Sequence, residues 1–404
     1  NIAPSWSKTS NQENAQYGWS VSTAGDVNGD GYDDVIVGAP YYDHSQENEG
    51  MVWVYHGNLE DLDSAPSWDK ESDQANAHFG YDVSTAGDVN GDGYSDVIVG
   101  APDIDMGQSD EGAAWVYKGS ADGLISKPIW YAQSDQADAA FGYSVSTAGD
   151  INADGYFDVI IGAPEWNNGQ NSEGGAWVFV GSHYGLNESF KWRQDSDQIG
   201  ANYGYSVGTA GDVNGDGCSD IIVGAPRYER TAEYENEGKA YVYLSTGSSL
   251  SYSPIFEKPS NQAGASFGCS VGTAGDVNGD GYADIIVGAY LWNAGETNEG
   301  GAWVYHGSSS GVISAPQWYA QGNQTTAHFG SSVASAGDVN GDGYADVVVG
   351  APWYEESYNQ EGEAFVYHGN GGEGLSLGMF NYNSEGVRVA HLGKLDTDQF
   401  RLST

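Results

Sequence analysis

The stretch Ala24–Pro40, AGDVNGDGYDDVIVGAP, decides the fold, because near-copies of it recur along the whole chain. The first aspartate of its GDVNGDGY core recurs at intervals of 62 residues, with one interval of 64. A Glu-Gly pair follows this aspartate after 23 residues, or after 25 in the fourth copy. A fixed period of this length indicates a repeat architecture built from one supersecondary unit. The first aspartates of the six copies are Asp26, Asp88, Asp150, Asp212, Asp276 and Asp338.

Each repeat alternates short β-branched or aromatic segments with polar, glycine-rich loops. In the third copy a short strand is expected within Phe141–Asp150, and Val159–Pro164 forms a continuous apolar run typical of a buried strand. Gly175–Gly181 is a third strand, and the more polar stretch that follows reads as an outer fourth strand. No helical periodicity is present. The pattern predicts an all-β propeller of four-stranded antiparallel blades, with six blades favoured.

The two ends of the chain bear on how the ring closes. The N-terminal APSWSKTS (Ala3–Ser10) matches the linking segment APSWDKES (Ala65–Ser72). We therefore expect it to supply the outer strand of the last blade and close the ring without a free edge. Residues 1–367 are predicted to form the propeller. Residues 368–404 lose the metal motif and are either the start of a following domain or an irregular extra blade, so seven blades are the alternative.

The charge balance excludes several classes of partner. The chain has 13 Lys+Arg against 57 Asp+Glu, a formal net charge of −44. Such a surface repels nucleic acid and anionic membranes, and no apolar run is long enough for a membrane span. An aromatic content of 13% argues for a packed core despite the acidity. Divalent cations are the counterpart that this many carboxylates suggest.

Each repeat presents the pattern D-x-N-x-D-G-x-x-D, with a backbone carbonyl expected as ligand at the seventh position. Oxygen donors at alternate positions and a glycine at the sharp turn suit a hard cation, and the flexible, carboxylate-rich loop favours calcium over magnesium. Zinc is disfavoured because no His or Cys cluster accompanies the loop. The alternative is a metal-free Asn/Asp/Gly turn. Ala153 replaces a loop glycine in the third copy, whose ligands are kept.

We predict about one calcium ion per repeat, six in all. The predicted ligands, repeat by repeat, are Asp26, Asn28, Asp30, Tyr32 and Asp34; Asp88, Asn90, Asp92, Tyr94 and Asp96; Asp150, Asn152, Asp154, Tyr156 and Asp158; Asp212, Asn214, Asp216, Cys218 and Asp220; Asp276, Asn278, Asp280, Tyr282 and Asp284; Asp338, Asn340, Asp342, Tyr344 and Asp346.

The only two cysteines both interrupt the repeat. Cys218 replaces the loop tyrosine of the fourth copy, and Cys269 follows Phe267-Gly268 in the fifth. Two departures in adjacent repeats suggest a disulfide that joins blades four and five. The alternative is a pair of small buried thiols.

The same short motifs flank the aspartate loop in every repeat. Phe-Gly or Tyr-Gly precedes the loop, and Gly-Ala, usually followed by Pro, comes after it, as at Phe79-Gly80 and Gly100-Ala101-Pro102. This bracket of motifs resembles the FG-GAP repeat of the integrin α-subunit propeller over residues 1–367. Departures are small: Tyr17 and Tyr203 stand for Phe, and Tyr290 stands for Pro. The near-identity of the copies resembles bacterial or archaeal secreted FG-GAP proteins.

The resemblance implies a calcium-bound, secreted or cell-surface module for adhesion or recognition. It places the metal loops on one face and the loops between second and third strands on the other, where a protein partner would bind. Aromatic residues in those loops either contact a ligand or pack within the propeller: Tyr41, Tyr42, Trp166, Tyr228, Trp292, Trp353 and Tyr354. The alternatives are a lectin-like carbohydrate-binding propeller, or the non-catalytic domain of a polysaccharide-active enzyme.

No catalytic constellation stands out in the sequence. There is no nucleophile elbow and no phosphate loop, and the eight histidines have no ligand spacing. Paired acids could serve glycosidic chemistry, but the acids here mostly repeat the symmetry that a catalytic site should break. The prediction is a protein without enzymatic activity.

Overall fold

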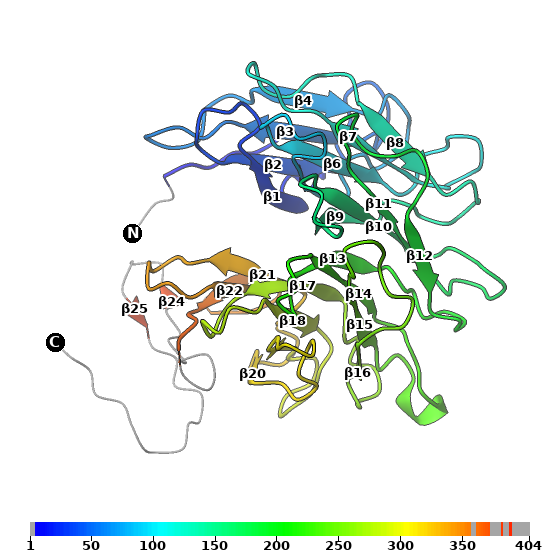
Figure 1. The fold of residues 1–404 in the computed structure, drawn as a ribbon, viewed down its shortest axis with the longest axis vertical. Helices are drawn as coiled ribbons and strands as arrows, with labels where there is room; N and C mark the ends of the chain where they lie inside the picture. Colours follow the sequence, from blue (N-terminus) through cyan, green and yellow to red (C-terminus); the bar gives the residue numbers. More distant parts are fainter. Residues whose placement is uncertain (1–4, 357–360, 372–380, 383–387, 390–404) are drawn as a thin grey trace.

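The computed structural model is a ring of antiparallel sheets arranged radially about a central axis (Figure 1). It describes residues 5–356, 361–371, 381–382 and 388–389. Five sheets have four strands in chain order, and the sixth has three within these residues. One short 3-10 helix, η1 (Ala232–Tyr234), is the only helix in the described part. The predicted all-β propeller with six blades is confirmed.

The strands run from the central axis outward in each blade. Their bounds are β1 Ser20–Gly25, β2 Asp34–Ala39, β3 Met51–Tyr55 and β4 Trp68–Glu71; β5 Val83–Gly87, β6 Asp96–Ala101, β7 Ala113–Tyr117 and β8 Trp130–Gln133; β9 Ser144–Gly149, β10 Asp158–Ala163, β11 Gly175–Phe179 and β12 Trp192–Asp195; β13 Ser206–Gly211, β14 Asp220–Ala225, β15 Lys239–Tyr243 and β16 Phe256–Pro259; β17 Ser270–Gly275, β18 Asp284–Ala289, β19 Gly301–Tyr305 and β20 Trp318–Gln321; β21 Ser332–Gly337, β22 Asp346–Ala351 and β23 Glu363–Tyr367. The short strands β24 (Asn381–Tyr382) and β25 (Arg388–Val389) pair with each other.

Burial along a blade follows the hydrophobic pattern of its strands. The second strand is apolar after its first residue, an aspartate, and every residue of β6 is buried. The outer strand β8 buries only its first residue, Trp130. That side chain packs edge-on against Phe179 of the next blade, with ring centroids 4.8 Å apart. Five of the six hydrophobic cores in the described residues therefore lie between two neighbouring blades, and the second and third blades share one of them. The sixth lies between the first blade and the N-terminal segment.

Glycines bring the backbones of neighbouring blades into direct contact. A Cβ atom on Gly100, the second-to-last residue of β6, would lie 2.0 Å from the carbonyl oxygen of Gly142 in the next blade. Gly142 has a φ of +87°, which favours glycine for a second reason. The same clash distance is 1.9–2.1 Å for the other four pairs in the described part: Gly38 with Gly80, Gly162 with Gly204, Gly224 with Gly268, and Gly288 with Gly330. The bracket seen in the sequence is thus the seam between blades.

The N-terminal segment packs where an outer strand preceding the first blade would lie. Trp6 contacts Tyr55 with ring centroids 4.9 Å apart, and its Nε1 donates to the carbonyl oxygen of Asp63 at 3.0 Å. Trp130 makes the equivalent hydrogen bond to Asn187 at 3.1 Å. Within the described residues, however, β23 pairs only with β22. Closure of the ring through this segment stays a prediction.

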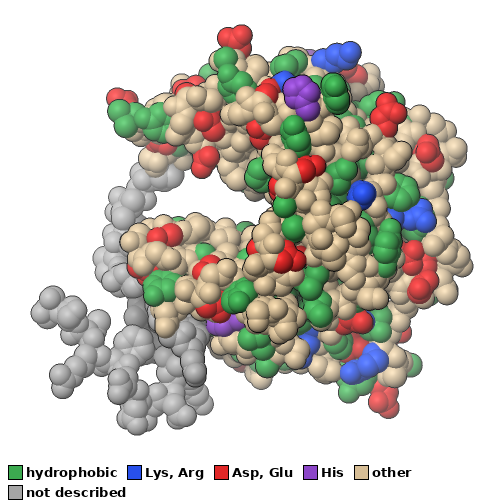
Figure 2. All heavy atoms as spheres, viewed as in Figure 1, with side chains coloured by type: hydrophobic (Ala, Val, Ile, Leu, Met, Phe, Trp, Pro, Cys, Tyr) green, Lys and Arg blue, Asp and Glu red, His purple; other side chains and the backbone are tan. Residues whose placement is uncertain are grey.

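The first and sixth blades flank an opening in the ring. Inner strands of neighbouring blades contact one another in order from β1 to β21, and Figure 2 shows a hollow between the first blade and the sixth. The prediction for residues 368–404 falls mostly outside the described residues. The boundary at residue 367 and the choice between a further domain and an extra blade therefore stay predictions.

The predicted disulfide between Cys218 and Cys269 is wrong. Both thiols are free and buried. Cys218 lies in the loop that precedes β14, whereas Cys269 directly precedes β17, at the opposite end of the strands. A strand of six residues spans about 20 Å, and a disulfide needs Cα atoms within about 7 Å. Adjacent position in the repeat therefore did not mean adjacent position in space.

Cys218 has a packing explanation in the preceding blade. In the first two blades the ring of Tyr94 covers Gly29, where a Cβ atom would lie 2.6 Å from Tyr94 Cε1. The third blade carries Ala153 at the position of Gly29, and the fourth carries Cys218 at the position of Tyr94. The smaller thiol leaves room for the alanine methyl group. The remaining pairs keep Tyr over Gly: Tyr156 over Gly91, Tyr282 over Gly215, and Tyr344 over Gly279.

This contact predicts strong coupling between the two positions. Cys218→Tyr alone should destabilise the protein by about 1–3 kcal/mol, because the ring meets the Ala153 methyl group. Ala153→Gly alone should be nearly neutral, since Ala153 has a φ of +54° that glycine adopts readily. The double variant should regain the stability lost by Cys218→Tyr. Urea unfolding of all four proteins gives the coupling free energy, and purely additive effects would refute the contact.

Candidate functional site

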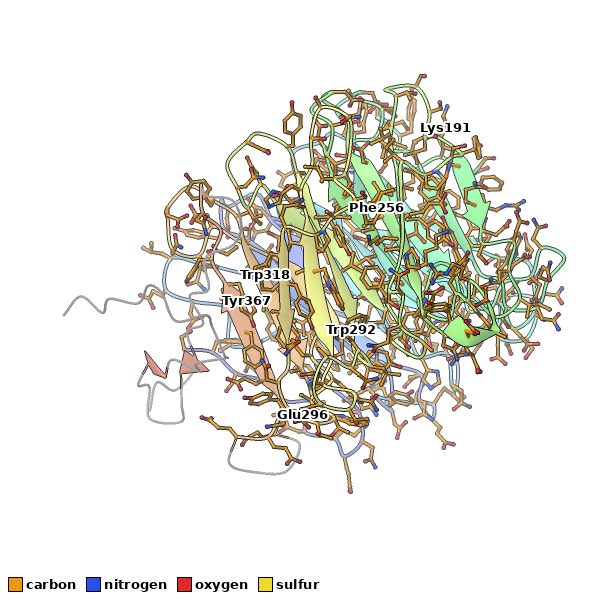
Figure 3. All side chains as sticks on the ribbon, turned by 90° about the horizontal axis from the view of Figure 1, so that it is seen from below. Lys191, Phe256, Trp292, Glu296, Trp318 and Tyr367 are labelled. Atoms are coloured by element: carbon orange, nitrogen blue, oxygen red, sulfur yellow. The ribbon has the colours of Figure 1, made fainter. Side chains whose placement is uncertain are left out.

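The two ends of the blades carry different chemistry. We call the end with the loops between first and second strands, such as Asp26–Asp34, the aspartate face. The other end, with the loops between second and third strands, is the glutamate face, because each loop there ends at the Glu-Gly pair. Figure 3 shows the blades from the side, with Glu296 toward the glutamate face and Lys191 at the other end.

The aspartates shape their own loops. In the first blade Asp26 Oδ1 accepts from the Gly29 N–H at 2.7 Å, and Oδ2 accepts from the Gly31 N–H at 2.8 Å. Asp30 Oδ1 accepts from the Tyr32 N–H at 3.0 Å. Such Asx-type bonds fix a tight polar loop without other secondary structure. In the sixth blade these bonds lower the pKa of Asp338, with the Gly343 N–H as the largest contributor.

The last aspartate of each loop is buried. Asp34 Oδ2 accepts from the Val27 N–H and Oδ1 from the Gly57 N–H, both at 2.9 Å. All six equivalents have no exposed surface. Burial, with smaller contributions from the two other loop acids, raises the pKa of four of them to about 7: Asp96, Asp158, Asp220 and Asp284. A buried carboxylate beside two acids is costly unless a proton or a cation compensates it.

The predicted ligands of each blade lie in one loop, in which the three aspartate carboxylates stand apart from one another. In none of the described loops do oxygens of all three aspartates come within 4.8 Å of one another. The first aspartate faces the backbone N–H groups instead, and Asn28 Nδ2 donates to Asp30 Oδ2 at 3.0 Å. The donor set is rich in carboxylate oxygen and fits a hard divalent cation. The side-chain orientations, by contrast, serve the loop's own hydrogen bonds.

The loops of neighbouring blades are joined into a belt. The Ser95 N–H of the second loop donates to the Asp26 carbonyl of the first at 2.9 Å, and the Ser120 N–H donates to Val27 O at 3.0 Å. The first of these bonds recurs at every junction from the first to the sixth described loop. A ligand that fixes the conformation of one loop would therefore also stabilise the contact between two blades.

The second loop contains a lysine ion pair, which the sequence analysis missed. Lys118 Nζ lies 2.5 Å from Asp92 Oδ2, and this bond raises the pKa of Lys118. The signal was visible in the repeat, because Lys118 precedes the glycine where three other repeats have histidine. This ammonium group therefore neutralises one of the carboxylates that the sequence predicts as ligands.

On the glutamate face, the Glu-Gly glutamates organise their loops. Glu49 is fully buried, and its Oε1 accepts from the N–H groups of His44 and Ser45 at 2.6 and 2.5 Å. Glu299 makes the same bonds to the loop of the fifth blade. These hydrogen bonds lower the pKa of Glu49 against the opposing effect of its burial.

Most of the candidate recognition aromatics pack on their own blade. Trp166 is buried against Trp177, with ring centroids 5.2 Å apart, and Trp292 packs in the same way on Trp303. Tyr42 and Tyr354 contact the third strand of their blades as well, and Tyr228 packs against a core. Trp353 is 45% exposed, and stacks on a histidine. Only a minority of the predicted aromatics is thus available to a partner.

A cavity of about 430 Å³ lies on the central axis, lined by the inner strands. Aromatic rings in a chain of contacts 4.8–5.5 Å apart border its glutamate-face end. These rings belong to Trp19, Tyr81, Tyr143 and Tyr205, which each precede an inner strand. Trp19 is 50% exposed. The sequence analysis missed this group, although each member follows the Phe-Gly or Tyr-Gly pair.

Asp82 breaks the symmetry of the cavity wall. The other five blades have serine at this position. Four of these serines, those of the first, third, fourth and fifth blades, accept an N–H from the next blade, as Ser144 does from Val207 at 3.2 Å. Asp82 Oδ2 accepts the equivalent N–H of Val145 at 2.8 Å, and Ser20 Oγ donates to its Oδ1. Burial raises the pKa of Asp82 to about 6, against these hydrogen bonds.

The family of the chain follows from its repeats. The pattern of the FG-GAP repeat family matches residues 17–55, 79–117, 141–179, 203–243, 267–305 and 329–367. These matches cover more than half of the chain, and each spans the first three strands of one blade. The chain belongs to the FG-GAP repeat family, as its bracketed loops indicated.

Curated relatives are integrin α-chains. Integrin alpha-5 of Xenopus laevis is 31% identical over 257 residues, which are 62% of this chain and 23% of that protein. Integrin alpha-3 of Cricetulus griseus is 28% identical over 319 residues, 75% of this chain and 28% of the relative. Integrin alpha pat-2 of Caenorhabditis elegans is 35% identical over 225 residues, 52% and 18% of the two chains. The chain spans less than a third of these relatives. Within its described residues no helix is long and apolar enough to cross a bilayer.

The raised pKa of Asp82 predicts that this residue lowers the free energy of unfolding in a pH-dependent way. Since the folded protein binds this proton more tightly than the unfolded chain, the carboxyl destabilises the fold increasingly as pH rises from about 4 to about 6. Asp82→Ser should therefore stabilise the protein at pH 7, on the order of 2 kcal/mol. The gain over wild type should shrink toward pH 4. Chemical denaturation of both proteins across this range, in saturating calcium, tests the claim, and a pH-independent difference would contradict it.

Proposed function

We propose that this chain is a calcium-stabilised, non-catalytic extracellular module that binds a protein partner through its glutamate face. The observation that carries the proposal is that the two faces of the propeller present different side chains. The acidic loops gather at one end of the blades, and a partly exposed aromatic border around the central cavity lies at the other. A cation-ordered scaffold that presents aromatic anchors is suited to protein recognition.

Calcium would act on the scaffold through the belt of loops on the aspartate face. The proposed ligands are those that the repeat predicts, with the carbonyl at the seventh position. A cation at each loop would compensate the buried last aspartate and the two acids beside it. Because each loop is hydrogen-bonded to the next, binding would also stabilise the junctions between blades. The second loop, where Lys118 pairs with Asp92, is proposed to bind more weakly than the others.

The similarity to integrin α-chains favours a protein partner and an extracellular setting. Relatives named as integrin alpha-5 and alpha-3 share the repeats along most of the propeller. The acidic surface is unsuited to nucleic acid or anionic membranes. Residues 1–367 are proposed to form the recognition domain, followed by the tail 368–404. A lectin-like propeller would use the same exposed aromatics to stack on sugar rings, so the choice between protein and glycan is put to the test below.

Removal of calcium should lower the melting temperature by at least several degrees. At a free concentration ten times Kd, each site contributes about 1.4 kcal/mol by mass action, and six sites act on one ring. Calorimetry in 1 mM calcium and in excess EGTA measures the shift, and returning calcium after EGTA should restore it. Magnesium at the same concentration should restore less. An unchanged melting curve in EGTA would defeat the calcium proposal.

Partner binding should depend on the glutamate face alone. A calcium-dependent pull-down from the cell-surface fraction of the source organism supplies the partner for a binding assay. Trp19→Ala and Trp353→Ala should each weaken binding at least tenfold, as expected for exposed anchor residues. Tyr184→Ala is the matched control, because Tyr184 is 94% exposed but lies at the aspartate-face end, between β11 and β12. If only Tyr184→Ala lost binding, the interface would lie on the aspartate face and the proposal would be wrong.

A glycan array separates the two recognition modes. Binding to a defined glycan that Trp19→Ala abolishes would support the lectin alternative. Binding to the deglycosylated partner protein would support the protein-recognition proposal.

A further inference from the structure

Three carboxylates of the third blade meet on the glutamate face, away from the six aspartate loops. We call Glu173, Asp195 and Asp197 the third-blade carboxylate cluster. Glu173 ends the loop between β10 and β11, Asp195 is the last residue of β12, and Asp197 follows two residues later. One oxygen from each of the three lies within 4.8 Å of the other two.

Glu173 brings a buried oxygen without a partner to this cluster. The residue has no exposed surface. Its Oε1 accepts from the Asn168 N–H, which orders the loop as in the other blades. Its Oε2 is also buried but has no hydrogen-bond partner. A buried carboxylate oxygen left unsatisfied carries a free-energy penalty that grows when further negative charges lie beside it.

The first and fourth blades place a basic side chain beside the equivalent glutamate. In the fourth blade Arg230 Nη2 lies 3.5 Å from Glu237 Oε2. In the first blade, His44 and Glu71 join Glu49 in a comparable group, and His44 Nδ1 lies 2.8 Å from Glu71 Oε2.

The third-blade cluster has no such cation among the described residues, where no Lys, Arg or His nitrogen lies within 4.0 Å of its carboxylates. The nearby Arg193 instead stacks over Trp166 and Phe190, at 4.8 and 5.5 Å from the ring centroids.

The fold does not require acids at the positions of Asp195 and Asp197. Strand pairing places Asp195 opposite Gly175, and the equivalent residue of the fifth blade is Gln321, opposite Gly301. Two residues later the fifth blade has Asn323 where the third has Asp197. The Oε2 atoms of the equivalent glutamates in the second and fourth blades also lack a hydrogen bond, but the fourth has Arg230 beside it. The two additional carboxylates around Glu173 are what distinguish the third blade from the second, fourth and fifth.

We propose that the third-blade carboxylate cluster binds one calcium-class divalent cation, separate from any ion of the aspartate loops. Three carboxylates supply hard oxygen ligands, and the exposure of Asp197 leaves the remaining coordination positions to water. The bound ion joins the β10–β11 loop to the end of β12. The competing arrangement is a proton shared within the cluster, which would hold no metal.

The test converts the third blade to the side chains of the fifth. The variant D195Q/D197N removes two ligands but introduces the residues that this fold already accepts at Gln321 and Asn323. Asp135→Asn, at the position of Asp197 in the second blade, is the matched control, because Gln133 rather than an acid lies two residues before it. Native mass spectrometry counts calcium ions on the folded chains. Anomalous scattering from crystals soaked in terbium, a calcium surrogate, locates the sites.

The wild type and the Asp135→Asn control should hold the same number of ions, and D195Q/D197N one fewer. An anomalous peak should lie between Glu173, Asp195 and Asp197 in the wild type and be absent from the variant. In EGTA the variant should be at least as stable as the wild type, since the charge repulsion is relieved. Equal ion counts, or no peak at the cluster, would overturn the proposal. Peaks at the aspartate loops are scored separately, so the calcium proposal for those loops stands or fails independently.

Discussion

The structure depends on the contact between two glycine backbones at each junction of neighbouring blades. The glycine just before the last residue of the second strand meets the glycine after the Phe or Tyr of the next blade, and a single Cβ atom there would lie about 2 Å from a carbonyl oxygen. No side chain can be accommodated without separating the blades. The spacing of the blades, and therefore the width of the central cavity, follows from this contact. The most regular sequence signature of the chain is thus an interface between repeats, which is where the stability of repeat proteins is concentrated.

On the aspartate face, neighbouring blades make a second contact that also requires glycine. There the tyrosine of one loop covers the glycine of the preceding loop, and N–H groups of one loop bond to carbonyls of the one before. Glycine is needed for the contact, and the tyrosine ring supplies buried area. The exchange of Tyr for Cys218 beside Ala153 follows from this packing. The belt of loops also explains how local charge can affect a ring of six blades, because each acidic loop is part of two blades at once.

Much of the fold could be predicted from the period and the hydrophobic pattern. Strand order, the buried second strand and the position of the aspartate loops between first and second strands all follow from local sequence. The orientations of Asp26 and its equivalents could not be predicted, because a carboxylate can serve either a cation or the nearby N–H groups. The pairing of Cys218 failed for a different reason. A repeat fixes equivalence between copies, but which non-equivalent residues of two copies touch depends on the stagger of the blades.

Residues that depart from the repeat fall into two groups. Some are matched by a complementary change in the neighbouring blade, and others are not. Cys218 is compensated by Ala153, so packing alone accounts for it. Asp82 stands where five blades have serine, and its hydrogen bonds reproduce those of serine while its charge adds a cost. Asp195 and Asp197 add charge beside a glutamate that is already buried, where the fifth blade has neutral side chains. In an array of near-identical units, the other units show what the fold requires. A charge that the fold neither requires nor compensates is best explained by a ligand, which is why the third-blade cluster, rather than the more numerous symmetric acids, points to an additional site.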